Sequence, residues 1–120
     1  MPHLHLEYTA NLPQLNADVA LIRLNNTLVG SGQFAAEFDI KSRATKVETF
    51  KVGTAMNERA FVAVRLALSG RSSEIKTQLS QSLLAVLQEL CEWPVGVEVQ
   101  LSVELLDIDR GSYNKTAIGV

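Results

Sequence analysis

The stretch AFVAVRLALSGRSSEIKTQLSQSLLAVLQEL, residues 60–90, changes its hydrophobic period partway along. Over residues 60–68 apolar side chains alternate with others, which is typical of a strand with one buried face. From Ser73 onward they recur at helical spacing, which predicts an amphipathic helix with Ser72 or Ser73 as its cap. The predicted apolar stripe consists of Ile75, Leu79, Leu83, Val86 and Leu90. A strand therefore leads directly into a helix.

A second strand follows this helix. Trp93-Pro94 ends the helix, because the residue before a proline avoids helical backbone angles. Residues 95–108, VGVEVQLSVELLDI, then alternate valine or leucine with small and polar residues. This is the clearest strand pattern in the chain.

The first half of the chain shows the same order of elements. HLHLEY, residues 3–8, alternates and predicts a strand. Residues 11–32 have helical spacing, with Asn11 as the predicted N-cap and two glycines at the end. The predicted inward stripe is Leu15, Val19, Ile22 and Val29. Residues 38–52 are more polar and predict a long, partly exposed strand.

The order strand–helix–strand thus occurs twice, over about residues 1–55 and 56–120 of a single predicted domain. Two such units can merge into one four-stranded mixed sheet with both helices on one face, an α/β (α+β) fold. The other face and the edges then lack a cover. We expect them to pair with further copies of the chain in a closed homo-oligomer.

Composition limits the classes of function. The 120 residues include 47% hydrophobic and 20% charged residues, as in an ordinary globular protein. A net charge of −2 and the lack of a basic block argue against a nucleic-acid partner. No apolar run approaches a membrane span, and no secretory signal pattern is present. With Cys91 as the single cysteine, we expect a cytoplasmic protein without an internal disulfide.

Familiar catalytic patterns are missing. His3 and His5 share a strand face, but no third ligand completes a metal site. The GSG at residues 30–32 follows a helix instead of opening one, so it is no phosphate loop. Ser72 and Ser73 stand in a capping context, without a histidine nearby in sequence. We therefore expect no metal and no cofactor.

The remaining candidate is Pro2. If Met1 is removed, Pro2 becomes a secondary amine, and an α-amino group titrates near pH 8. Nearby cations lower that pKa toward the working pH of a base, and the candidates are Lys41, Arg43 and Arg71. The alternative is that Pro2 merely begins a strand and the three cations are solvated surface charges.

Four stretches resemble the 5-carboxymethyl-2-hydroxymuconate isomerase family of the tautomerase superfamily, and the resemblance covers essentially the whole chain in the order of its elements. They are MPHLHLEYTANL (1–12), IKSRA (40–44), AFVAVRLALSGRSSE (60–74) and the last strand. The resemblance implies a ring-like homotrimer, a small polycarboxylate substrate and a cofactor-free reaction in the breakdown of aromatic compounds. Pro2 is then the acid–base group. It moves a proton from the 2-hydroxy group of a dienol tricarboxylate to carbon C5.

The resemblance also assigns substrate-binding cations. Arg71 matches the arginine of the family's GRS motif, and Arg43 matches the second cation of the SR pair. Lys41 stands where family members have arginine, and lysine lacks the planar fork that grips a carboxylate. Two alternatives therefore stay open. The chain acts on another unsaturated acid, or it is a trimeric binding module that retains Met1 and lacks catalysis.

Overall fold

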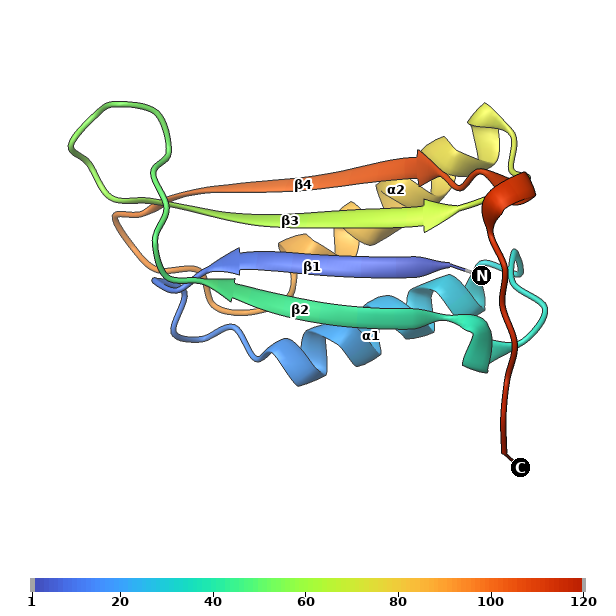
Figure 1. The fold of residues 1–120 in the computed structure, drawn as a ribbon. Coiled ribbons are helices and arrows are strands. Elements are labelled where there is room, and N and C mark those ends of the chain that lie inside the picture. Colours follow the sequence, from blue (N-terminus) through green and yellow to red (C-terminus); the bar gives the residue numbers. More distant parts are fainter. Residues whose placement is uncertain (1, 120) are drawn as a thin grey trace.

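Two helices cover one face of a four-stranded sheet in the computed structural model, which describes residues 2–119 (Figure 1). The elements are β1 (His3–Thr9), α1 (Ala17–Gly30), η1 (Glu37–Asp39), β2 (Lys41–Val47), β3 (Arg59–Leu68), α2 (Ser73–Gln88), β4 (Glu98–Asp107) and η2 (Arg110–Ser112). The strand order is β2-β1-β3-β4. β1 runs parallel to β2, β3 runs parallel to β4, and the two pairs meet at antiparallel β1 and β3. The predicted mixed sheet is confirmed.

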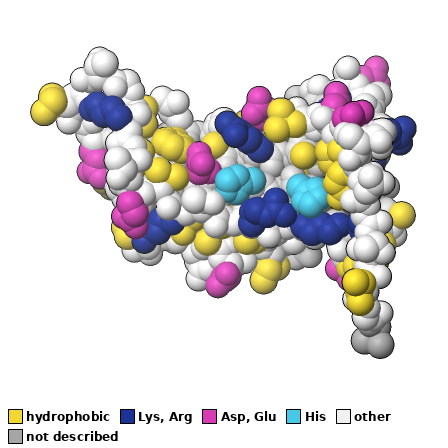
Figure 2. All heavy atoms as spheres, in the orientation of Figure 1, with side chains coloured by type: hydrophobic (Ala, Val, Ile, Leu, Met, Phe, Trp, Pro, Cys, Tyr) yellow, Lys and Arg dark blue, Asp and Glu magenta, His cyan; other side chains and the backbone are white. Residues whose placement is uncertain are grey.

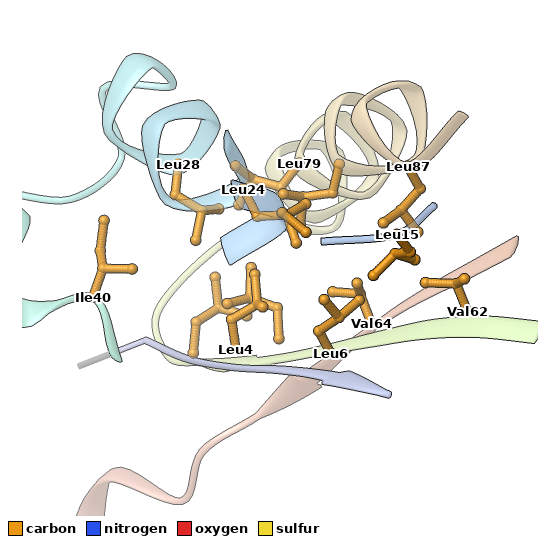
Figure 3. Packing of buried hydrophobic residues seen from close by; sticks show 14 of the residues in the cluster. Leu4, Leu6, Leu15, Leu24, Leu28, Ile40, Val62, Val64, Leu79 and Leu87 are labelled. Atoms are coloured by element: carbon orange, nitrogen blue, oxygen red, sulfur yellow. The ribbon is translucent and has the colours of Figure 1, made fainter. Parts of the chain in front are cut away.

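The core lies between the sheet and the helices (Figure 3). On β1, Leu4 and Leu6 are fully buried, as the alternation of residues 3–8 predicts. On β3 every second side chain is buried in the same way. These β3 residues are Ala60, Val62, Val64, Leu66 and Leu68. The period-two pattern of both central strands was therefore a sound guide to the buried face.

The prediction for α1 was wrong in its start and its face. The helix begins after Asn16, whose side chain accepts a hydrogen bond from the Val19 amide at 3.2 Å, and not at Asn11. Val19, Ile22 and Val29 point outward and are 49%, 62% and 46% exposed. The buried side chains are Ala20, Leu24 and Leu28. This helix is apolar on two sides, so its spacing alone did not decide which side meets the sheet.

Other boundaries also differ from the sequence prediction. β2 covers only residues 41–47 of the predicted 38–52, because η1 occupies its start and a loop its end. The α2 cap is Ser72, and the helix ends at Gln88, ahead of Leu90. Its buried side chains are Leu79, Leu83 and Leu87. Among the helices of residues 2–119, none has the length and apolarity to cross a membrane.

The sheet face without helices carries charged side chains together with apolar ones such as Leu106, which is 41% exposed. In Figure 1 the strands lie in front of the helices, so Figure 2 shows this uncovered face, with the two histidines beside Lys and Arg side chains. Parallel register places His3 beside Lys41 and His5 beside Arg43. The Arg65–Glu104 ion pair, 3.4 Å, lies farther along the same face.

Candidate active site

Pro2 lies at the end of the sheet where β1 and β2 begin and β3 ends. It is buried, and its carbonyl accepts a hydrogen bond from the Lys41 amide at 3.1 Å. The parallel pairing of β1 with β2 brings Lys41 to this end, and the antiparallel pairing with β3 brings the residues after Leu68. Strand topology therefore gathers residues around Pro2 that are far apart in sequence.

A cavity of about 270 Å³ opens at this end. Its lining comes from the α1–β2 connection, η1, the β3–α2 junction and η2. The lining residues are Pro2, Phe34, Ala35, Asp39, Ser69, Arg71 and Arg110. Its volume lies near the lower end of the range for small-molecule sites. Hollows of about 340 Å³ and 380 Å³ lie elsewhere on the molecule, and Pro2 lines neither.

Arg71 is held firmly in the cavity wall. Its guanidinium donates hydrogen bonds to the carbonyls of Ser69 and Gln33, and its Cζ lies 5.0 Å from the Phe34 ring centroid. This stacking and the two bonds fix the plane of the guanidinium. Arg71 therefore contributes a positioned charge, with much of its donor capacity already used by the backbone.

Lys41 is also engaged within the chain. Its Nζ donates to the Asp39 carbonyl at 2.7 Å, and burial and the Lys115 ammonium hold the pKa of Lys41 below its usual range. The Lys115 Nζ lies 2.5 Å from Asp39 Oδ1. This hydrogen bond lowers the pKa of Asp39 and raises that of Lys115. Two lysines thus flank Asp39, whose carboxylate is the one acidic group among the described lining residues of the cavity.

Arg43 lies apart from this cavity, on the uncovered face. Its guanidinium donates to His3 Nδ1 at 3.2 Å, so the neutral ring carries its proton on Nε2 and donates to the Tyr113 hydroxyl at 2.9 Å. Burial and the Arg43 charge hold the pKa of His3 below its usual range. His5 Nε2 pairs with Thr45 Oγ1 at 2.8 Å. Within residues 2–119, no three acidic, histidine or cysteine side chains gather as a metal site requires.

Comparison with known proteins agrees with the fold. The family model of 5-carboxymethyl-2-hydroxymuconate isomerase matches residues 2–119. The chain belongs to this family. A 5-carboxymethyl-2-hydroxymuconate isomerase from Deinococcus radiodurans R1 is 30% identical and superposes with a TM-score of 0.84, covering 96% of this chain and 88% of that one. Family membership makes the protein an isomerase of the tautomerase superfamily.

More distant structures share the fold. A fused 4-OT protein, a symmetric trimer, is 16% identical with a TM-score of 0.70 and covers 95% of this chain and 93% of its own. A malonate semialdehyde decarboxylase is 17% identical with a TM-score of 0.62, at 95% and 90% coverage. No curated protein matches the chain.

Of the four site residues that the sequence and the family resemblance suggested, Pro2 and Arg71 line one cavity in this isomerase. Lys41 adjoins Pro2 through its backbone, and Arg43 lies on the uncovered face.

Sequence reasoning missed Arg110 and Asp39. The place of Arg110 follows from strand pairing, which the sequence pattern did not reveal: Leu68 pairs with Asp107, and the Ile108 amide donates to the Leu68 carbonyl at 2.8 Å. Continuing both strands brings the residues after Ile108 to the β3–α2 junction.

Proposed function

We propose that this isomerase moves a double bond in 5-carboxymethyl-2-hydroxymuconate, with Pro2 as acid–base group and without a cofactor. The reaction belongs to the breakdown of aromatic acids. The observation that carries the proposal is the shared cavity of Pro2, Arg71 and Arg110. It offers a candidate base and two permanent cations to a polyanionic substrate.

The base requires a free amine at Pro2. While Met1 is attached, the Pro2 nitrogen is an amide and has no basicity; Met1 itself lies outside the described residues. Once freed, an α-amino group titrates near pH 8, and neighbouring cations disfavour its ammonium form. The arginines in the cavity wall therefore poise the amine close to neutral pH, where a general base works best.

The proposed reaction moves one proton. The neutral Pro2 amine takes the proton of the 2-hydroxy group, and the resulting dienolate carries its negative charge on that oxygen. The ammonium then returns the proton to C5, which leaves a 2-oxo acid with the remaining double bond between C3 and C4. Cations in the cavity wall stabilise the negative charge that develops on this oxygen.

Lys115 makes the cavity acceptable to an anion. Asp39 lines the cavity, and its carboxylate opposes the entry of a tricarboxylate. The Lys115 ammonium at 2.5 Å and the nearby Lys41 offset that charge. The C-terminal segment, which crosses this end of the sheet in Figure 1, thereby takes part in substrate binding.

We also propose a homotrimer. β2 and β4 are the edge strands of the sheet, and the uncovered face presents charged side chains that can pair across an interface. The related fused 4-OT protein forms a symmetric trimer, which supports the same assembly for this fold. In such a ring Arg43 faces a neighbouring copy, so its predicted role in substrate binding would serve a site shared between two copies.

The test uses protein that mass spectrometry shows to begin at Pro2. It is mixed with 5-carboxymethyl-2-hydroxymuconate, and the loss of the conjugated dienol absorbance is followed against the buffer rate. We expect rapid loss. No loss from a folded oligomer that begins at Pro2 would refute this substrate. Native protein that keeps Met1 would instead favour a binding module.

Lys41 favours a second candidate, an isomerase acting on a different unsaturated acid. Its ammonium is bound to the Asp39 carbonyl, and it offers no bidentate fork to a carboxylate. A substrate with fewer carboxylates suits this arrangement. Parallel assays with a 2-hydroxydienoate that has a single carboxylate distinguish the two candidates by their kcat/KM values.

A further inference from the structure

Arg110 is an exposed residue that, in the described part of the chain, lacks the partners that Arg71, Lys41 and Lys115 have. It begins η2, beyond the end of β4, and its side chain lines the cavity with Pro2 and Arg71. Within residues 2–119 no hydrogen bond or ion pair involves its guanidinium. Arg71, in contrast, donates to two backbone carbonyls. Lys41 and Lys115 are both bound at Asp39.

Gly70 provides the space for this guanidinium. A Cβ atom at Gly70 would lie 2.5 Å from Arg110 Nη2 and 3.0 Å from its Cζ, so the guanidinium rests directly against the Gly70 backbone. Gly70 also has a φ of +69°, which side-chain-bearing residues rarely adopt. The motif Gly70-Arg71-Ser72 thus affects two arginines. Arg71 is held by its hydrogen bonds to backbone carbonyls, and Arg110 fits beside the motif because Gly70 has no side chain.

An unpartnered guanidinium in a cavity is suited to a carboxylate. Arginine presents five N–H donors in a fixed fork that matches the two oxygens of a carboxylate. Asp39, the only acidic lining residue of the cavity among those described, is already engaged by Lys115. The donors of Arg110 therefore remain available for a ligand.

We propose that Arg110 is a substrate-binding residue that grips a carboxylate of the polycarboxylate substrate, in a bidentate pair that Arg71 and Lys41 are not free to form. The inference rests on the proposed function for the identity of the substrate. It assigns the specificity for a multiply charged acid to the C-terminal segment. It also explains how the chain functions with lysine at position 41.

The test compares Arg110→Gln and Arg110→Lys with wild-type protein that begins at Pro2. We expect Arg110→Gln to raise KM for 5-carboxymethyl-2-hydroxymuconate by about 10- to 100-fold, the range for a lost charge-assisted hydrogen-bond pair. The change in kcat should be smaller. Arg110→Lys keeps the positive charge but cannot form the bidentate pair, so its KM should lie between the values of the wild type and Arg110→Gln. Arg23→Gln, a change outside the cavity on α1, is the control for loss of an arginine charge.

A second substrate and a binding assay make the result specific. With a 2-hydroxydienoate that has one carboxylate, the Arg110→Gln loss should be several-fold smaller. Calorimetric titration with tricarballylate, an unreactive tricarboxylate, should give about 10- to 100-fold weaker binding to Arg110→Gln. An unchanged KM and an unchanged affinity for tricarballylate would overturn the role of Arg110 and leave the proposed function intact.

Inactivity of the wild type toward the muconate would overturn the proposed function alone, and tricarballylate binding would still decide the role of Arg110. If the wild type turns over the muconate but fails to bind tricarballylate, the proposed function stands and the KM of Arg110→Gln alone decides the role of Arg110. Gly70→Ala supplies an independent check. It should raise KM in the wild type by crowding Arg110, but add little in the Arg110→Gln background. Equal effects in the two backgrounds would contradict the link between Gly70 and Arg110.

Discussion

The two ends of the sheet each carry a hollow, but only the hollow at the Pro2 end contains an arginine that bonds to no other residue of the range 2–119. At the far end a hollow of about 340 Å³ lies beside Asn11 and the β2–β3 loop. There Arg59 is paired with Glu98 at 3.3 Å and also donates to the Val52 carbonyl. At the Pro2 end a smaller cavity, about 270 Å³, contains Arg71 and Arg110 against Asp39 alone.

The difference shows that volume does not identify the site in this molecule. The far end is larger, yet Arg59 pairs with Glu98, and the Lys51 ammonium donates to the Ala55 carbonyl. The Glu58 carboxylate accepts a hydrogen bond from the Asn11 amide. The Pro2 end is smaller, but its Arg110 guanidinium forms no such bond within residues 2–119. Lys41 and Lys115 also adjoin its lining carboxylate, Asp39, and this balance of charge draws an anionic ligand. We therefore expect changes at the Pro2 end to alter turnover and KM, and changes at the far end to alter stability.

The largest expected effect comes from Pro2→Ala. Replacing the secondary amine should lower kcat by about 100-fold or more, the range for loss of a general acid–base group, while the oligomer stays intact. Stopped-flow loss of the dienol absorbance measures the rate. Pro13→Ala, at an exposed proline before α1, is the matched control and should keep wild-type kcat. Full activity of Pro2→Ala would exclude the proline mechanism.

At the far end, Arg59→Gln should destabilise the fold without affecting binding. Arg59 loses its ion pair with Glu98 and its bond to the Val52 carbonyl, and its side chain is 25% exposed. We expect the free energy of unfolding to fall by about 1–2 kcal/mol, measured by urea denaturation. KM for the muconate should stay at the wild-type value. A raised KM would show that the far end also binds substrate.

A smaller effect is expected from Lys115→Gln. Asp39 then loses the ammonium at 2.5 Å, and its charge opposes the substrate more strongly. We expect KM to rise about threefold to tenfold with little change in kcat, as for loss of a partly screened charge. The double variant Asp39→Asn with Lys115→Gln should recover most of the wild-type KM. If the double variant is worse than Lys115→Gln, Asp39 is itself needed for binding.

The smallest effect concerns His3 on the uncovered face. Its pKa in the folded state lies below 6.5, the value expected for an unfolded chain, so the folded protein resists protonation of this ring. The contribution of His3 to stability is therefore complete above about pH 6.5 and is lost as the pH falls through the lower, folded-state pKa. Thermal unfolding between pH 7.5 and 5 should show a smaller decline for His3→Gln than for wild type. Parallel declines would exclude this role.

Strands and helices with a clear hydrophobic period could be predicted from the sequence. Contacts between residues that only the pairing of strands brings together could not. Strict alternation identified the buried faces of β1 and β3, and the Ser72 cap placed the start of α2. The inward face of α1 was missed because its valines and isoleucine formed a competing apolar side.

Within the candidate site, Pro2 was proposed from its place in the chain and from the family resemblance, which also assigned the GRS motif its Arg71. Arg110 is 108 positions beyond Pro2 and carries no motif. It reaches the cavity only because β3 and β4 pair in parallel up to Leu68 and Asp107. Lys115 likewise meets Asp39 through the path of the C-terminal segment. Such contacts follow from strand pairing, which hydrophobic periodicity does not encode.

The most direct test of the account is the titration of the Pro2 nitrogen. In protein labelled with ¹⁵N-proline and shown by mass to begin at Pro2, the ¹⁵N chemical shift is followed against pH. The account predicts a pKa below the usual range of about 7.7–8.0 for an α-amino group, and an upward shift of that pKa in Arg110→Gln. A Pro2 pKa at or above the usual range would contradict the claim that uncompensated positive charge makes this end of the sheet the active site.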